Sequence, residues 1–474
     1  MSRPSAHSYR PTSHERWNHE TLATLAFDWE RIGAPGIAPK RPFKVYLPTT
    51  TEEVVRAVRE AKELDQKLIV RGHGHSSNNL VTGARACVLL TEWMDQIVEI
   101  DEERLTCTMQ GGAVLAQVDT ALAEHGLGLS IIGDHDDITA AGFASVGGIS
   151  PASHRYGMFV DTVIELEYVD WEGIVHTCSR THRREDLLRL LAGTGRHGVI
   201  TSLEVSIVRV DKRREVLRND SFVTLDVSNF IERSGKLIED PGDAVMERGV
   251  WADLPVTGGV NIRVGQFSSY HETTQNPLKS LYNRAAYGYQ QLLGYWAGRL
   301  PGRIDVAAKY LGFAAIMLPP SFADFKNVER FTDQILDSTV GDPTRMLIVL
   351  APADKYGVLF RELYRLCLDE RDNSGAITFI SLYVKAIRSS YLSRGEEDRR
   401  HCELMLYVGV DPDRMTEKIL NGLVERIDAL TVAHSAFRYM HTRTTADPVR
   451  RQLVDPNTAY EAVELATSDT VNPR

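Results

Sequence analysis

Apolar and polar residues follow two different patterns along this chain. Over residues 36–212 the apolar runs are short and are separated by polar or glycine-containing segments, which predicts strands of a few residues each. These predicted strands cover residues 42–48, 68–70, 87–93, 96–101, 105–110, 163–169, 174–179 and 198–210. The runs at 163–169 and 174–179 flank the sequence DWEG, so we predict a hairpin with Gly173 in its turn.

Helical spacing is less frequent in this part of the chain. Residues 54–61 carry apolar side chains at the interval of an amphipathic helix, and Thr50 with Glu53 fits a capping box at its start. A second helix is predicted after Ala113 and ends at Gly126. Because helices and strands do not alternate regularly, this part of the chain predicts an α+β unit and not a doubly wound parallel sheet.

Beyond residue 212 the predicted elements are longer. Strands are expected at 220–228, 260–268, 346–352, 376–384 and 403–410, and helices near 321–338, 353–368 and 413–430. This order favours a second domain in which helices cover a largely antiparallel sheet. We therefore predict an α+β, two-domain fold with an N-terminal extension (1–35), a first domain (36–212), a second domain (213–440) and a C-terminal segment (441–474) returning to the first domain.

The composition narrows the class of protein. With 474 residues, 43% hydrophobic and 25% charged, the chain resembles ordinary globular proteins. A net charge of -10 argues against general nucleic-acid binding and against an anionic membrane surface. No apolar run approaches the roughly 18 residues of a membrane span. We expect no nucleic-acid partner and no membrane partner.

Cysteine usage and the N-terminal sequence indicate the cellular compartment of the protein. The five cysteines are scattered without a CxxC pair, which favours reduced, buried thiols over disulfides or a zinc site. The first residues, MSRPSAHSYRPTSHERW, contain neither an apolar segment nor a twin arginine, which predicts no secretion signal. Both features favour a cytoplasmic protein. Residues 279–312 are rich in aromatic side chains, which in an acidic protein favours a core or a possible homodimer interface.

The sequence RGHGHSS at residues 71–77 is the first candidate for chemistry. His73 and His75 could be two ligands of a metal ion, and residues 134–137 could add carboxylates and another imidazole. Neither of these two segments has the ligand spacing of a zinc site. The glycines could instead expose backbone N–H groups that bind a phosphate, although no Walker A or Rossmann motif is complete. A turn with satisfied histidines is the third interpretation.

Three further segments, taken in order, carry a family resemblance. They read TAAGFASVGGISPASHRYG (139–157), DTVIELEYVDWEGIVHTCS (161–179) and LLAGTGRHGVIT (190–201). Together with Gly74-His75-Ser76 they resemble the PCMH-type FAD-binding domain of vanillyl-alcohol-oxidase-like flavoenzymes, and most of all the cytokinin dehydrogenases. The resemblance covers about residues 40–210. It implies a two-domain PCMH-type fold and FAD as cofactor.

The resemblance also implies roles for individual residues. Arg71 to Ser76 would surround the FAD pyrophosphate, and His75 would bond covalently to the flavin. Asp134 would take a proton from the substrate as hydride leaves for the flavin, with His135 as an alternative base. The cofactor-binding residues implied are Arg71, Gly72, His73, Gly74, His75, Ser76, Asp134, Thr139, Gly142, Ser145, Gly148, Ile149, Gly198 and Ile200.

Departures from the cytokinin dehydrogenase pattern concern the substrate side. The family's Trp-Thr-Asp-Tyr run is replaced here by Ile-Gly-Asp-His at 132–135, and His154 occupies an aromatic position. The RYMHTR stretch at 438–443 places alternating polar side chains on one strand face. Residues expected to face the substrate are His154, Tyr383, Arg438 and His441, with Lys385, Tyr439 and Arg443 as further candidates.

The functional hypothesis is an FAD-dependent oxidase or dehydrogenase. It would oxidise a C–N or C–O bond of a small molecule and pass electrons to oxygen or another acceptor. Alternatives are an alcohol, sugar or secondary-metabolite flavin oxidase, a flavin-bound protein without turnover and, from another class, a metal-dependent hydrolase or lyase using His73, His75 and Asp134 to Asp137.

Overall fold

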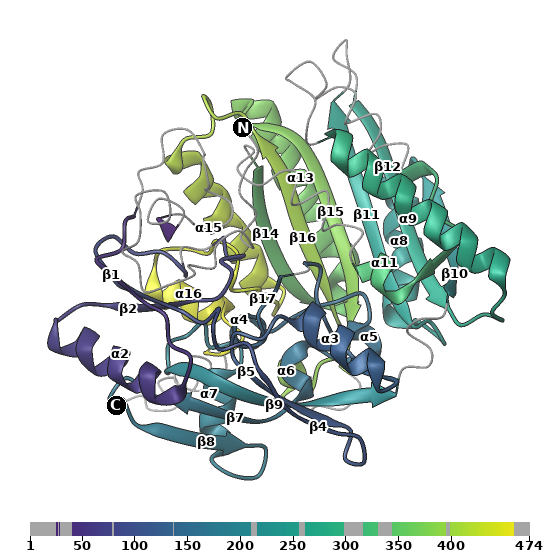
Figure 1. Ribbon diagram of the computed structural model, residues 1–474. Helices are drawn as coiled ribbons and strands as arrows, with labels where there is room; N and C mark the ends of the chain where they lie inside the picture. The colour runs from purple at the N-terminus through teal and green to yellow at the C-terminus, as the bar shows by residue number, and fades with distance from the viewer. Residues whose placement is uncertain are drawn as a thin grey trace, which may run out of the picture.

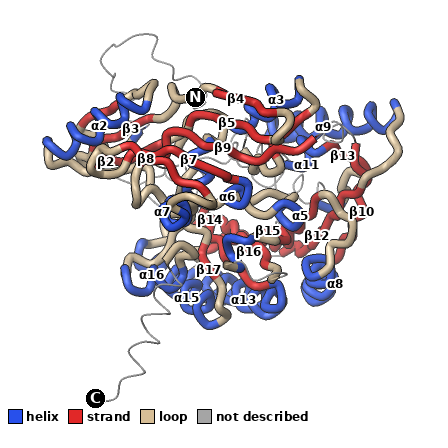
Figure 2. The backbone as a smooth tube through the Cα atoms, turned by 90° about the horizontal axis from the view of Figure 1, so that it is seen from below, coloured by secondary structure: helices blue, strands red, loops and turns tan. Residues whose placement is uncertain are grey.

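Three β-sheets form the framework of the protein (Figure 1). The computed structural model describes residues 25, 26, 28, 40–77, 80–135, 137–209, 216–255, 261–297, 316–329, 344–394 and 399–458. Two sheets are built from residues before 210 and the third from residues after 215. Figure 2 shows the third sheet between the N-terminal sheets on one side and a layer of helices on the other. The predicted α+β fold with a helix-covered antiparallel sheet is confirmed.

The first sheet is small and parallel. Its strands are β1 (Lys44–Tyr46), β2 (Leu68–Arg71) and β3 (Cys87–Leu90), with β3 in the centre. Helix α2 (Thr51–Glu63) packs its buried apolar side against this sheet, as its spacing predicts. Thr50 accepts the N–H of Glu53 as an N-cap, but the Glu53 carboxylate bonds back to the N–H of Thr49 and not to that of Thr50.

The second sheet is antiparallel and ends in the predicted hairpin. Its order is β4 (Ile97–Asp101), β5 (Thr106–Gln110), β9 (Val199–Arg209), β7 (Val163–Val169) and β8 (Val175–Ser179), and β6 (Leu127–Leu129) pairs with β9. Gly173 adopts a φ of 76° in the turn between β7 and β8. The helices of this half are α3 (Leu115–Glu124), α4 (Ala140–Val146), α5 (Ser153–Tyr156), α6 (Phe159–Thr162) and α7 (Arg184–Leu190).

The third sheet has eight strands, and every neighbouring pair is antiparallel. In spatial order they are β13 (Phe322–Asp324), β10 (Val216–Thr224), β12 (Asn261–His271), β11 (Met246–Pro255), β15 (Ile377–Ile387), β16 (His401–Val410), β14 (Thr344–Pro352) and β17 (Phe437–Arg438). Helices α8 (Val227–Glu239), α13 (Tyr356–Ser374) and α15 (Glu417–Ala433) cover one face (Figure 2). The remaining elements are α9 (Pro277–Ala297), α11 (Phe325–Glu329), the 3-10 turn η3 (Ala353–Lys355), α14 (Ser390–Ser393) and α16 (Pro448–Val454).

Strand periodicity decides which side chains of the third sheet face the N-terminal half. Alternate residues of a strand point to opposite faces. Leu382 and Val384 of β15 therefore pack into the helix-side core, and Leu404 of β16 does the same. Their neighbours Lys385 and Glu403, which are directly paired in register, face the other way. Two charged side chains thus occupy the face that meets the N-terminal half.

Three parts of the predicted element pattern need correction. The strand expected to reach residue 228 ends at Thr224, because Asp226 caps helix α8 by accepting the N–H of Asn229 at 2.9 Å. Helix α8 and strand β11 were not expected from the pattern. Where a helix was expected near 321–338, the described residues form β13 followed by α11, and residues 330–338 lie outside the described part.

The five cysteines are buried and unpaired, as expected. No helix in the described part of the chain is long and apolar enough to cross a membrane.

Candidate functional site

A large cavity lies where the N-terminal half meets the third sheet. Its volume is about 1370 Å³ with the open space at its mouth included. One wall comes from the RGHGHSS loop, α4 and the start of β9, and the other from β14, β15, β16 and residues 439–441. The cavity is therefore built from both halves of the chain.

The RGHGHSS loop forms a tight wall because its glycines leave no room for side chains. A Cβ on Gly72 would lie 2.3 Å from Thr139 Oγ1. Gly74 has a φ of +83°, and a Cβ there would lie 2.4 Å from Arg71 Nη2. The buried Arg71 thus supports the loop from behind, and its Nη1 donates to the carbonyl of Val81. Burial lowers the pKa of Arg71 to about 10, partly offset by Glu92 and Asp28.

Three imidazoles and one carboxylate meet on this wall. His75 Nε2 lies 2.5 Å from Asp137 Oδ1, and His73 Nδ1 lies 3.8 Å from Asp137 Oδ2. His135 stacks on His75 with ring centroids 4.6 Å apart. Burial acts to raise the pKa of Asp137, but the hydrogen bond from His75 and the neighbouring imidazoles hold it well below its usual range. Asp137 is therefore an anion that orients His75 through Nε2.

A buried ion-pair triad marks the opposite wall. Lys385 Nζ lies 2.7 Å from Asp134 Oδ2 and 3.1 Å from Glu403 Oε2. Burial acts to lower the pKa of Lys385, but the two carboxylates raise it above its ordinary value. Burial raises the pKa of Glu403, with a further contribution from Asp134 and an opposing one from Lys385. The triad links the loop that carries Asp134 to the centre of the third sheet.

Tyr439 and His441 close the cavity beside the triad. The hydroxyl of Tyr439 accepts the N–H of Gly148 at 2.9 Å, and its ring meets His441 edge to face at 4.5 Å. The carbonyl of His441 accepts the N–H of Ser77 at 3.0 Å. Burial, together with His135, Lys385 and His75, lowers the pKa of His441 to about 3. This imidazole is therefore neutral at physiological pH.

A second, smaller cavity adjoins the first. Its volume is about 450 Å³, and it shares Asp134, Lys385 and Met405 with the large cavity. The rest of its wall includes Arg248, Gln266 and Tyr383 from three neighbouring strands of the third sheet. Burial raises the pKa of Tyr383 to about 12, so its hydroxyl keeps its proton. The Asp134–Lys385 ion pair thus borders both cavities.

Most of the residues expected from the sequence lie together. The expected residues that line the large cavity are Gly72, His73, Gly74, His75, Ser76, Asp134, His135, Thr139, Gly142, Ser145, Ile149, Gly198, Ile200 and His441, and Tyr383 lines the smaller one. Arg71, Gly148, His154 and Arg438 line neither. Gly148 instead donates to Tyr439, and both ring nitrogens of the buried His154 face backbone carbonyls. Arg438 is fully buried against Asp428 and the carbonyl of Arg443, which makes it a structural group.

Other lining residues were not singled out from the sequence. Glu403 is the main one, and its signal was a single acid within the apolar strand HCELMLYVGV. Thr194 and Gly195 also line the cavity, and both belong to the glycine-rich segment 190–201 that carries part of the family resemblance. Among the described residues, which exclude Asp136, no group of three or more His, Cys, Asp or Glu side chains could hold a metal ion.

Part of the chain matches a known sequence family. Residues 42–179 match the sequence model of the FAD binding domain family. These residues supply the glycine loop, α4 and most of one cavity wall.

The individual relatives are dehydrogenases and oxidases by name. The chain is 26% identical to cytokinin dehydrogenase 3 of Arabidopsis thaliana over 202 residues, which is 42% of this chain and 38% of that protein. It is 26% identical to L-gulonolactone oxidase of Bos taurus over 35% of this chain and 38% of that protein. The matched segment thus spans well under half of these relatives. The fold resembles 6-hydroxy-D-nicotine oxidase from Arthrobacter nicotinovorans, with a TM-score of 0.62, 15% identity and coverage of 96% and 95% of the two chains.

The wall of the large cavity fits FAD. Gly72, Gly142 and Gly198 line it at positions where a Cβ would meet protein atoms within 2.7 Å, so the wall packs tightly only with glycine there. Nδ1 of His75 is buried in this wall and has no hydrogen-bond partner among the described residues, while Nε2 faces Asp137. The lining residue His75 thus brings a buried ring nitrogen without a hydrogen-bond partner to this wall.

Proposed function

We propose that this protein is an FAD-dependent oxidoreductase that oxidises a C–N or C–O bond of a small molecule. The observation that carries the proposal is the Asp134–Lys385 ion pair, which borders both the large cavity and the smaller cavity beside it. Bound FAD supplies the hydride acceptor. The residues of the chain hold the cofactor, orient the substrate and accept a proton.

The glycine loop and α4 hold the cofactor in this proposal. Arg71 keeps the loop in shape from beneath, and the residues from Gly72 to Ser76 meet the cofactor directly. His75 would hold the flavin through a ring nitrogen. Asp137 supports this role because an anion at Nε2 fixes the ring and makes the opposite nitrogen more basic.

Asp134 accepts the proton from the N–H or O–H of the substrate. Removing hydride from a C–H next to such a group requires a base for the heteroatom. Asp134 is favoured over His135 because it borders both cavities, whereas His135 lines only the larger. Lys385 holds the Asp134 carboxylate in place, and Glu403 holds Lys385 from the strand partner position.

The smaller cavity receives the substrate. Tyr383, Gln266 and Arg248 present a protonated hydroxyl, an amide and a guanidinium along one wall, and Met405 and Val250 make another part apolar. This lining suits a compact molecule that carries an oxygen acceptor at one end. The electron acceptor that reoxidises the flavin is oxygen or another oxidant.

Anaerobic reduction of the flavin tests the proposal. A panel of small amines, alcohols and hydroxy lactones is mixed with the holoprotein while the absorbance near 450 nm is followed. We expect at least one compound to bleach the flavin, and Asp134→Asn to slow this step by about 10²–10⁴-fold with its flavin retained. Equal rates in both proteins would remove Asp134 as the base.

A further inference from the structure

The loop at residues 192–198 joins α7 to β9 and belongs to the cavity wall. Thr194, Gly195 and Gly198 line the large cavity. The loop is strained: Ala192 and Thr194 have φ values of 53° and 52°, and Gly198 has a φ of 142°. Residues in such conformations persist only where their surroundings hold them. The contacts that hold this loop therefore set the shape of the cavity.

From the cavity side, the loop is tied to helix α4. The N–H of Ala192 donates to the carbonyl of Ala144, and the N–H of Thr194 donates to the carbonyl of Ser145, both at 2.8 Å. These bonds fix the strained residues against the helix that forms the neighbouring part of the wall. They do not hold the end of α7 or Arg196, which lie further from α4.

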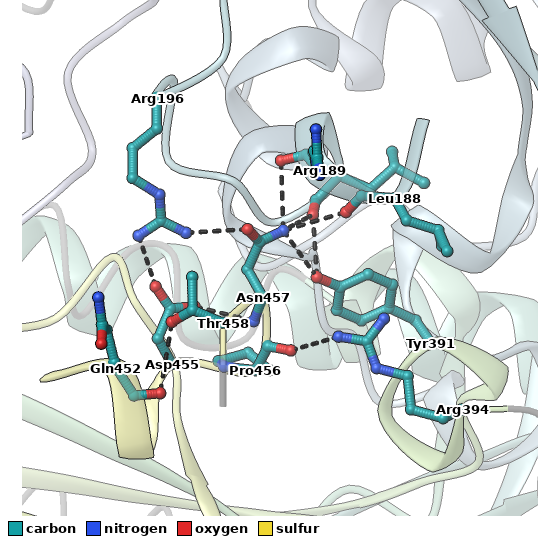
Figure 3. A network of polar contacts seen from close by, with 11 residues as sticks. Leu188, Arg189, Arg196, Tyr391, Arg394, Gln452, Asp455, Pro456, Asn457 and Thr458 are labelled. Carbon is teal, nitrogen blue, oxygen red and sulfur yellow. Dashed lines mark hydrogen bonds and ion pairs between the residues drawn. The ribbon is translucent and has the colours of Figure 1, made fainter. Parts of the chain in front are cut away.

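From outside, residues 455–458 hold the loop (Figure 3). Asn457 Nδ2 lies 3.0 Å from the carbonyls of Leu188 and Leu191, 3.2 Å from that of Arg189 and 3.2 Å from the hydroxyl of Tyr391. These carbonyls belong to the last turn of α7 and the residue after it, where no further helix turn can satisfy them. One amide from the C-terminal part of the chain thus caps the helix that leads into the loop.

The same segment fixes the other end of the loop through Arg196. Arg196 donates to Asp455 and, at 3.1 Å, to Oδ1 of Asn457, and the side chain of Asp455 is only 1% exposed. Trp171 from the β7–β8 turn donates to the Arg196 carbonyl at 2.7 Å. Pro456 is held in turn by Arg394, at 2.7 Å. Figure 3 shows Asn457 between Arg196 on one side and the α7 end with Tyr391 on the other.

We propose that Asn457 and Asp455 are positioning residues for the FAD site, which they shape through the 192–198 loop without touching the cofactor. The inference rests on the large cavity being the FAD site. Asn457 suits this role because its amide donates toward the carbonyls around the end of α7 while its oxygen accepts from Arg196. A carboxylate at this position could accept from Arg196 but could not donate to the carbonyls.

The test measures FAD affinity in a background without a covalent bond. FAD is titrated into flavin-free His75→Ala protein, alone and with Asn457→Ala or Asn457→Asp, and binding is followed by flavin fluorescence. If the variant loses the free energy of about one net hydrogen bond, the dissociation constant of FAD rises on the order of tenfold. We expect this rise in both variants, since Asn457→Asp also places an anion against carbonyls.

Asn283→Ala is the matched control. Asn283 is a buried asparagine that bonds to Asp324 and Asn327 far from either cavity. The Asn283→Ala substitution should lower the melting temperature of the flavin-free protein without changing its affinity for FAD. Unchanged affinity in Asn457→Ala would overturn the inference, as would an equal loss in the control. If the His75→Ala parent and the wild type bind no FAD at all, the proposed function itself fails.

Discussion

Lys385 is a cation shared by the buried carboxylate of Glu403 and the half-buried carboxylate of Asp134. Its side chain is 7% exposed, that of Glu403 3% and that of Asp134 19%. Burying three charges is costly, and the cost is offset only while the cation lies between the two anions. The triad therefore couples the stability of the third sheet to the position of the proposed base.

Removing the central cation tests this coupling. Lys385→Met leaves Glu403 and Asp134 facing each other without compensation, so we expect the free energy of unfolding to fall by about 3–5 kcal/mol. Adding Glu403→Leu to that variant removes one anion that no cation compensates, so part of the lost free energy of unfolding should be restored. Urea unfolding of the three proteins measures both effects.

A surface lysine provides the comparison. Lys355 pairs with Asp354 at 3.2 Å, and its side chain is 46% exposed, so Lys355→Met should cost less than about 1 kcal/mol. A similar small loss in Lys385→Met would contradict the triad's role in stability.

At the scale of single residues, much of the wall of the large cavity could be predicted from the sequence, and less of the wall of the smaller cavity. Gly72 and Gly74 stood out because glycines and histidines alternate after a buried strand, and the structure places both in the wall. Glu403 could not be matched to Lys385, because their pairing depends on the register of two strands joined through α14. The polar alternation around Arg438 was visible, but its burial against Asp428 was not.

At the scale of elements, strand β11 connects the third sheet to the N-terminal half. The N–H of Glu247 donates to the carbonyl of Pro151 at 2.8 Å, and Ser269 of β12 donates to its carboxylate at 2.7 Å. Burial raises the pKa of Glu247 to about 7, opposed by the Ser269 bond and by Arg400. A carboxyl group that remains protonated near neutrality thus lies at the contact between the two halves.

This raised pKa makes stability depend on pH. Because the folded pKa of Glu247 lies above its unfolded value of 4.5, its contribution is fully present below pH 4.5 and is lost as the pH rises through about 7. Glu247→Gln should therefore become more stable relative to wild type as the pH rises from 5 to 8. Urea unfolding across this range gives the difference.

The exposed position Glu63 supplies the control for the amide substitution. Glu63→Gln should follow the wild-type pH profile. A Glu247→Gln profile parallel to that of wild type would show that Glu247 releases its proton at an ordinary pH.

Elements with local signals were predictable from the sequence. The α2 helix and the β7–β8 hairpin follow from residues adjacent in the chain, namely apolar spacing, a threonine cap and Gly173. Strand β11 was missed because charged and small residues, such as those in MERGVWADLP, interrupt its apolar pattern. Its charged residues Glu247 and Asp253 are tolerated because each is bonded within the fold.

At the scale of the whole molecule, the two cavities exist only because the N-terminal half packs on the third sheet. Glu403 and Met405 of β16 line the same cavity as Gly142 and Ser145 of α4, which lie far away in the sequence. His441 bonds to Ser77, Tyr439 to Gly148 and Asn457 to the end of α7, so the part of the chain after β17 contacts the cofactor half repeatedly. A C-terminal return to the first domain could be expected from the sequence, but these partners could not.

The most direct measurement is where the flavin colour goes when the protein is precipitated with acid. We expect purified wild type to absorb near 450 nm and its colour to stay in the pellet, because the proposed bond to His75 would hold the flavin covalently. The colour of His75→Ala should move to the supernatant, whereas that of His125→Ala, which changes an exposed histidine paired with Glu102, should stay in the pellet. Colour released from the wild type would contradict the histidyl bond, and a colourless protein that takes up no FAD would contradict the proposed function.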